Sequence, residues 1–250
     1  MSGHSKWASI KHKKAATDSK RGKVFSKLAK EITVAAKGSG GDPSTNVRLR
    51  MLIQKAKEAN MPADNVTRAI KKGTGELPGV SYEEQTYEGF GAGGVAVIVD
   101  VLTDNKNRTA AELRMIFSKK NANMAGANAV AWMFNKKGYI EIPKDAVDEE
   151  KVFTVATEAG ADDFVVGDSA YEIEVALENF EKVKKAIADA GIKMGLAEVT
   201  MIPQNTVKVT GKDAVNVLSL VEDLEDHDDV QNVYANFDIS EEEIKQISGE

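Results

Sequence analysis

The strongest constraint in this sequence is a change of charge about one third of the way along the chain. Residues 1–75 contain 17 Lys and Arg against 5 Asp and Glu, a net charge of +12. Residues 76–250 contain 16 basic and 34 acidic side chains, a net charge of −18. Such a division is typical of a protein that binds a polyanion with one part and stays soluble through the rest. Nucleic acid is therefore the first partner to consider.

Length and composition exclude several classes of protein. A chain of 250 residues can form two or three domains with buried cores. It contains no cysteine, which excludes disulfides, thiolate zinc sites and cysteine nucleophiles. The longest strongly apolar run, Val95–Val99, is far shorter than the ~20 residues that cross a bilayer, and the first residues lack the apolar core of a signal peptide. We expect a cytoplasmic protein with no membrane contact.

The basic segment has helical periodicity. Lysines at positions 20, 23, 27 and 30 recur on one side of a predicted helix that ends at Gly38–Pro43. The opposite side carries Val24, Phe25, Leu28, Ile32 and Ala35. A second helix, capped by Ser44 or Thr45, and a third that starts at Met61–Pro62, with Pro62 suited to its first position, have similar apolar stripes. Because short amphipathic helices cannot bury such stripes alone, we expect a three-helix bundle.

Beyond the linker Leu77–Gly79, strands alternate with helices. Two strands over Tyr82–Gly89 and Val95–Leu102, joined by the turn Gly91–Gly94, precede a helix over Asn107–Lys120. The following order is βαββαβ, as in a split ferredoxin-like unit: Ala131–Ile142, Glu149–Ala159, Asp163–Val166, Tyr171–Ala176 after a Gly167-Asp168 turn, Asn179–Ala190 and Ala197–Ile202. The tail adds a strand over Val207–Thr210, a helix over Ala214–Leu224 and a strand over Val230–Phe237.

These elements predict an α+β fold, with an N-terminal three-helix domain followed by two ferredoxin-like α+β domains, one inserted in the other. The expected boundaries are 1–76 for the basic arm and helical bundle, 80–130 plus 204–240 for a discontinuous α+β domain, and 131–203 for the inserted domain. Residues 1–76 are expected to contact nucleic acid.

The sequence contains little that is typical of an enzyme active site. The three histidines are His4, His12 and His227, and no G-x-S-x-G turn exists to present a serine. Gly89–Gly94 matches G-x-G-x-x-G, but a dinucleotide site needs a helix after this loop and here a strand follows. We therefore predict a tight β-turn, no catalytic or cofactor-binding residues and no small-molecule substrate.

Two other features have plain structural interpretations. The acidic run from Asp223 to Asp229 lacks the alternating ligands and turn glycine of a calcium loop, so we predict a solvated acidic face and no metal site. Trp132 and Phe134 alternate on a predicted strand, which indicates core positions rather than a surface that stacks on bases.

The candidate nucleic-acid-binding residues begin in an acid-free arm. Lysines can neutralise phosphates, and Trp7 can stack on an unpaired base. The first predicted helix extends this basic surface. The predicted contact residues are Lys6, Trp7, Lys11, Lys13, Lys14, Lys20, Arg21, Lys23, Lys27 and Lys30. A solvated helix face with a disordered arm is the alternative, and the arm itself is expected to lack order when free because residues 2–14 have no apolar stripe.

Motifs along the whole chain resemble one known family. They include Gly3-His4-Ser5-Lys6-Trp7 with Ile10–Lys14, Asn60-Met61-Pro62, Tyr87-Glu88-Gly89, Asp104–Thr109, and Trp132 and Phe134 followed by Gly138. Together they resemble the YebC/PmpR family. The resemblance implies a helical domain followed by two α+β domains. It also implies a DNA-binding transcriptional regulator, or a translational activator or ribosome-associated factor, since relatives of each kind are described.

Three functions therefore stay open at this point. The first is a DNA-binding transcriptional regulator, whose acidic domains could meet a protein partner. The second is a ribosome-associated translation factor that binds rRNA, which is favoured by the lack of an obvious recognition helix with base-reading side chains. The third is a protein that senses a small molecule or is purely structural, although no residue names a ligand.

Overall fold

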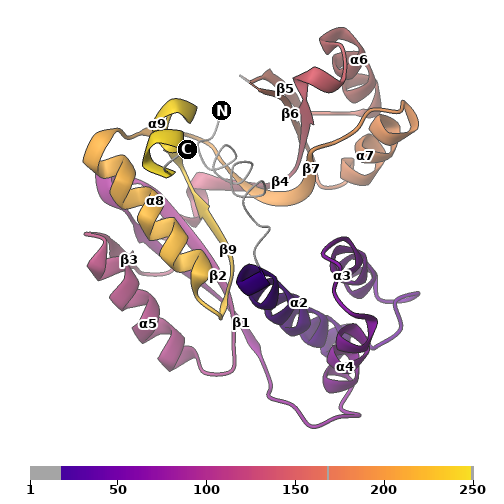
Figure 1. The fold of residues 1–250 in the computed structure, drawn as a ribbon, viewed down its shortest axis with the longest axis vertical. Coiled ribbons are helices and arrows are strands. Elements are labelled where there is room, and N and C mark those ends of the chain that lie inside the picture. Colours follow the sequence, from indigo (N-terminus) through magenta and orange to yellow (C-terminus); the bar gives the residue numbers. More distant parts are fainter. Residues whose placement is uncertain (1–17, 168, 249–250) are drawn as a thin grey trace. The chain divides into compact units, whose positions relative to one another are not determined.

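The computed structural model describes residues 18–167 and 169–248. These residues form two compact units. One unit contains residues 18–130 and 209–235, and the other contains residues 131–208 and 236–248 without residue 168. Figure 1 shows the succession of their helices and strands. Within the described residues, no helix is both long enough and apolar enough to cross a bilayer.

Three helices open the first unit: α2 (Asp18–Ser39), α3 (Val47–Glu58) and α4 (Ala63–Gly73). α2 packs against both other helices, which confirms the predicted helical domain. Their apolar faces share one core, formed by Leu28, Ile32, Ala35, Leu49, Leu52, Ala56, Met61 and Ala69.

The start of α3 differs from the prediction. Its N-cap is Asn46, not Ser44 or Thr45, and the Asn46 side chain accepts a hydrogen bond from the Leu49 amide. The same side chain donates to the carbonyl oxygens of Ala35 and Gly40, at 2.8 Å each. Asn46 therefore ties the end of α2 to the start of α3, a long-range role that local capping preferences do not reveal. Pro62 is likewise the N-cap of α4 and not its first residue.

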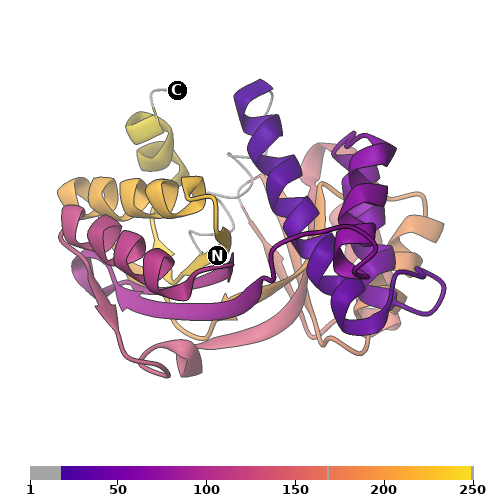
Figure 2. The same ribbon diagram turned by 90° about the horizontal axis from the view of Figure 1, so that it is seen from below.

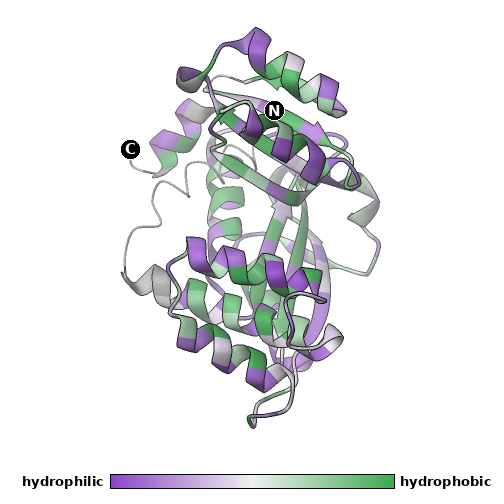
Figure 3. Cartoon of the chain, turned by 90° about the vertical axis from the view of Figure 1, so that its right-hand side faces the viewer, coloured by the Kyte–Doolittle hydropathy of each residue, from purple (hydrophilic) through white to green (hydrophobic). Residues whose placement is uncertain are grey.

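An antiparallel sheet with strand order β3-β1-β2-β9 and two helices form the rest of the first unit. Its strands are β1 (Glu83–Phe90), β2 (Ala96–Thr103), β3 (Asn123–Ala125) and β9 (Val230–Ala235). Helices α5 (Lys106–Lys119) and α8 (Gly211–Asp226) lie side by side over one face of this sheet (Figures 1 and 2). Both helices bury apolar residues and leave most of their polar residues exposed. Figure 3 shows the same mixture of hydrophobic and hydrophilic residues on the helices that face the viewer.

The glycine-rich loop lies in the hairpin between β1 and β2. It contains the short 3-10 turn η1 (Ala92–Gly94), in which Gly93 and Gly94 have φ values of 67° and 79°. These left-handed conformations suit glycine because it has no Cβ. The predicted tight turn is confirmed, and the G-x-G-x-x-G match does not open a helix.

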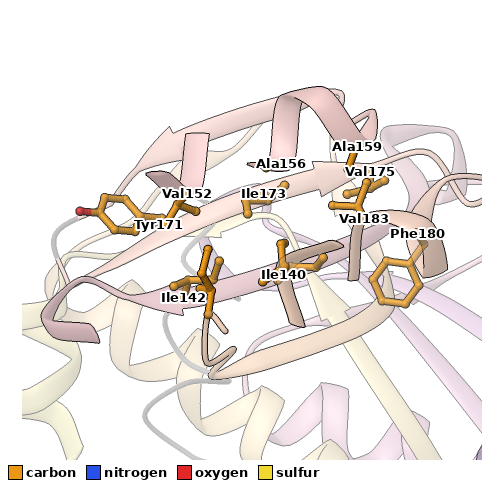
Figure 4. Packing of buried hydrophobic residues seen from close by; sticks show 12 residues of the cluster. Ile140, Ile142, Val152, Ala156, Ala159, Tyr171, Ile173, Val175, Phe180 and Val183 are labelled. Atoms are coloured by element: carbon orange, nitrogen blue, oxygen red, sulfur yellow. The ribbon is translucent and has the colours of Figure 1, made fainter. Parts of the chain in front are cut away.

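The second unit contains the sheet β5-β6-β4-β7, in which all paired strands are antiparallel. Its strands are β4 (Phe134–Pro143), β5 (Asp163–Val166), β6 (Ala170–Val175) and β7 (Leu196–Pro203). Helices α6 (Glu149–Ala159) and α7 (Phe180–Asp189) cover one face, and the short turns η2 (Ala131–Met133) and η3 (Lys144–Ala146) flank β4. Figure 4 shows side chains of the core of this unit, with Tyr171 at one end of the cluster and Phe180 at the other. The predicted βαββαβ order and the α+β fold class are confirmed, while Asp168 of the predicted turn lies outside the described residues.

The tail of the chain corrects one topological prediction. The predicted strand Val207–Thr210 was expected to complete the sheet that contains β1 and β2. It is instead the two-residue strand β8 (Val207–Lys208), which pairs in parallel with β10 (Phe237–Asp238). Both strands belong to the second unit, as does the last helix, α9 (Glu241–Ser248). The local sequence correctly indicates a strand at Val207–Lys208, but it does not indicate which strand pairs with it.

Candidate nucleic-acid interface

The structure describes part of the predicted contact set. Lys6, Trp7, Lys11, Lys13 and Lys14 lie outside the described residues, and Lys20 and Arg21 are placed by their backbone in α2 but not by their side chains. The other three, Lys23, Lys27 and Lys30, have described side chains on α2. Their spacing of four and three residues puts them on one stripe of the helix.

These three lysines contact the segment that ends α8, residues 225–229, which we term the acidic turn. Lys23 Nζ lies 3.2 Å from the Asp226 carbonyl oxygen and 3.6 Å from its carboxylate. Lys27 Nζ lies 2.6 Å from the Glu225 carbonyl oxygen. Lys30 Nζ lies 3.0 Å from the Asp228 carbonyl oxygen and 2.8 Å from the Asp229 carboxylate. The basic stripe of α2 is therefore matched to oxygen atoms within the same unit.

Asp229 is the most deeply placed acid of the turn, with 5% of its surface exposed. Besides Lys30, its carboxylate accepts hydrogen bonds from Arg108 at 2.7 Å, Thr109 at 2.8 Å and Thr103 at 3.2 Å. Burial alone would raise the pKa of Asp229, but the hydrogen bonds from Lys30, Arg108 and Thr109 hold that pKa well below its usual range. Asp229 is therefore a fixed negative charge at neutral pH.

This geometry corrects the prediction for the acidic run. We expected a solvated face from Asp223 to Asp229, but Asp229 is buried and the Glu225 side chain is partly buried. The carbonyl oxygens at the end of α8 lack partners within the helix, so they attract cations. The lysines that meet them lie about 200 residues earlier in the chain, and composition alone does not connect the two segments.

His227 closes the end of α8 and has both ring nitrogens engaged. Its Nδ1 accepts from the Asp229 amide at 3.1 Å, so its Nε2 carries the hydrogen that reaches the Glu112 carboxylate at 2.9 Å. The ligand atoms of Glu112, His227 and Asp229 lie within 4.8 Å of one another. These groups are held in place by hydrogen bonds and ion pairs with one another and with Arg108.

A second set of basic side chains lies on α3 and α4, and our contact set did not include it. The exposed members are Lys55, Lys57, Arg68, Lys71 and Lys72. The two arginines at the start of α3 are already engaged, Arg48 by an ion pair with Glu84 and Arg50 by hydrogen bonds to the carbonyl oxygens of Pro43 and Ser44 at 2.9 and 3.2 Å. The positive net charge of residues 1–75 includes these side chains and is the signal that indicates them. The prediction rested instead on the helical spacing of the lysines on α2.

The two aromatic residues of the Trp132 motif differ from each other. Phe134 is 5% exposed, so its core position is confirmed. The prediction for Trp132 was wrong, because it is 66% exposed in the turn η2. Residues 131–133 form a 3-10 turn before β4 begins, so the alternation of apolar residues does not continue as a strand there.

Comparison with known proteins gives a consistent result over most of the chain. Residues 5–76 match a model of the TACO1/YebC protein N-terminal domain, and residues 82–237 match a model of the TACO1/YebC second and third domain. A probable transcriptional regulatory protein of Natranaerobius thermophilus is 59% identical over 244 residues, which are 96% of this chain and 98% of the relative. A similarly named protein of Geobacter sulfurreducens is 59% identical over 247 residues, which are 99% of this chain and the whole relative.

A solved structure agrees with these matches. The crystal structure of a conserved hypothetical protein from Aquifex aeolicus superposes with a TM-score of 0.79 and 44% sequence identity. The match covers 89% of this chain and 92% of that protein. The resemblance carried by the sequence motifs is confirmed: this chain belongs to the TACO1/YebC family.

Proposed function

We propose that this chain is a nucleic-acid-binding regulator of gene expression that acts on transcription by binding duplex DNA. The observation that carries the proposal is the separation of charge, +12 in residues 1–75 against −18 in the rest. A concentrated positive charge attracts phosphates over distances comparable with the Debye length, about 8–10 Å at physiological salt. The names of the two bacterial relatives support a regulatory role.

In this proposal, the segment 1–76 meets the nucleic acid. The arm contributes Lys6, Trp7, Lys11, Lys13 and Lys14, and the first helix contributes Lys20, Arg21, Lys23, Lys27 and Lys30. The two α+β domains, residues 80–130 with 204–240 and residues 131–203, carry acidic surfaces that suit a protein partner and repel nucleic acid. The protein acts in the cytoplasm and performs no catalysis, so it needs no cofactor or substrate.

A second candidate is a ribosome-associated translation factor that binds rRNA. The engagement of Arg48 and Arg50 favours it, because arginine is the side chain that most often reads guanine in the major groove. The exposed basic side chains of α3 and α4 are mainly lysines, which act as point charges toward phosphates. Such a surface suits structured RNA as well as DNA.

One competition experiment separates the two candidates. Labelled duplex DNA competes with purified ribosomes for the full-length protein across a salt series. Duplex binding that persists against ribosomes and depends on sequence supports the transcriptional regulator. Ribosome binding that persists in salt and displaces DNA supports the translation factor. Failure to bind either would overturn both.

A charge variant tests the role of the arm. Substituting Lys6, Lys11, Lys13 and Lys14 with Gln should lower affinity and flatten the dependence of log K on log salt by about one unit per lost phosphate contact. The matched control replaces Lys182, Lys193, Lys208 and Lys212, four exposed lysines outside the basic segment, with Gln. Equal losses in both variants would mean that net charge alone, and not the arm, determines binding.

A further inference from the structure

Three of the lysines that the proposed function assigns to nucleic acid already hold oxygen atoms of the acidic turn. Three of their contacts are with main-chain carbonyls of residues 225, 226 and 228, and two are with carboxylates. A helix C-terminus carries partial negative charge, and added carboxylates strengthen it. The acidic turn thus presents to α2 a row of anionic and dipolar oxygens, the type of group that a phosphate backbone presents.

The contacts become stronger along α2. The Lys23 and Asp226 side chains are 46% and 63% exposed, and an exposed ion pair of this kind contributes about 0–1 kcal/mol. The Lys30 and Asp229 side chains are only 17% and 6% exposed. The interface therefore has a weak outer end at Lys23 and a firm inner end at Lys30.

The ammonium groups of these lysines cannot bind the oxygens of the acidic turn and those of a phosphate backbone at the same time with this geometry. Lys27 and Lys30 each place Nζ within 3.0 Å of acidic-turn oxygens, on the side of α2 opposite its apolar core. A phosphate on this stripe would take the place of the acidic turn. Because the contacts are polar, a densely charged polyanion can exchange with them when its local phosphate concentration is high.

We propose that the acidic turn, residues 225–229, is an internal competitor for nucleic acid that covers the basic stripe of α2 until a phosphate backbone displaces it. The inference rests on the proposed function, since it requires that the basic segment binds nucleic acid. In this proposal, the arm and the exposed lysines of α3 and α4 bind the nucleic acid first. The basic stripe of α2 becomes accessible to phosphates only afterwards. It also means that small anions, which do not present a dense row of phosphates, bind poorly to the basic stripe.

Neutralising the acidic turn tests the proposal. The variant Glu225→Gln, Asp226→Asn, Asp228→Asn keeps Asp229 and its hydrogen bonds. It removes three negative charges from the acidic turn, including the Asp226 carboxylate that lies 3.6 Å from Lys23 Nζ. The control Glu158→Gln, Glu178→Gln, Glu181→Gln removes the same charge from exposed positions of the other unit. We expect the acidic-turn variant to bind a labelled 20-base-pair duplex, or an rRNA fragment, about threefold or more tightly than the control. Equal affinities of the two variants would overturn the proposal.

Hydrogen exchange of the unaltered protein supplies a second measurement. The His227 amide donates to Leu224 and the Val230 amide to His227, so both report on the end of α8. Displacement of the turn predicts faster exchange of these amides when the duplex or rRNA fragment is bound. Unchanged or slower exchange in a saturated complex overturns the inference while leaving the proposed function intact. If no variant binds either nucleic acid, the proposed function fails and the inference fails with it.

Discussion

Lys30 Nζ lies 2.8 Å from Asp229 Oδ1, so an ion pair joins helix α2 to the segment that follows α8, 199 residues later. Lys30 also lies 5.7 Å from the centre of the Tyr82 ring. On the other side of the carboxylate, Arg108 donates to Oδ2 and also pairs with Asp104 at 2.9 Å. Asp229 therefore connects three segments that lie far apart in the sequence. We expect its removal to lower the stability of the whole first unit.

Asp229→Asn tests this role. The amide keeps the shape of the side chain but leaves Lys30 and Arg108 facing a neutral group, so we expect the free energy of unfolding to fall by about 2–3 kcal/mol. Urea denaturation measures the change. The control is Asp228→Asn, whose side chain is exposed, and it should shift stability by less than about 0.5 kcal/mol. Similar small effects from both variants would show that the network around Asp229 contributes little.

The low pKa of Asp229 gives stability a defined pH dependence. A carboxylate whose pKa is lower in the folded state than in the unfolded chain stabilises the fold above the unfolded value, about 3.9 for aspartate. This contribution is lost as pH falls below about 4. Glu31 acts in the opposite sense, since burial raises its pKa. The difference in unfolding free energy between the unaltered protein and Asp229→Asn isolates Asp229: it should be constant from pH 5 to 7 and shrink below pH 4. A difference that persists unchanged to pH 2 would contradict the assignment.

Local sequence predicted much of the second unit because its signals are short-range. The helix Glu149–Ala159 and the strand Asp163–Val166 have the predicted bounds. Gly160 ends the helix with φ of 104°, a left-handed conformation that glycine adopts readily. Apolar periodicity and a glycine stop are sufficient in such places, since neither depends on a distant partner.

The features that the sequence did not predict depend on distant partners. Asn46 caps α3 because it also binds Ala35 and Gly40, and β8 finds a strand about 30 residues away. The acidic turn meets lysines from the other end of the chain. In each case local propensity was satisfied by more than one arrangement, and tertiary contacts selected among them.

Gly138 on β4 has no room for a side chain. A Cβ there would lie 2.2 Å from Cδ2 and 2.8 Å from Cγ of Phe180, a buried residue at the start of α7 (Figure 4 shows its ring). Because the ring is held in the core, Gly138→Ala should destabilise the protein by about 1–3 kcal/mol. Thermal or urea unfolding measures the loss. Gly126→Ala is the matched control, since its Cβ meets open space and should change stability by less than about 0.5 kcal/mol. Equal effects would mean that Phe180 moves aside easily.

Glu88 holds the loop that precedes η2. Its carboxylate, on a residue only 6% exposed, accepts from the amides of Asn128 and Val130 at 2.7 Å each. Glu88→Gln replaces one acceptor oxygen by a donor, so one of the two amides loses its acceptor. We expect a loss of about 1–3 kcal/mol in unfolding free energy and faster hydrogen exchange at Asn128 and Val130.

The control for this prediction lies on the same strand. Glu83→Gln changes the same chemical group at an exposed position of β1, and it should leave both the stability and the two amides unaffected. If Glu88→Gln changes stability without changing exchange at Asn128 and Val130, the carboxylate acts through other contacts than the loop. If exchange rises at these two amides alone, the Glu88 carboxylate fixes the backbone of the loop that contains Asn128 and Val130.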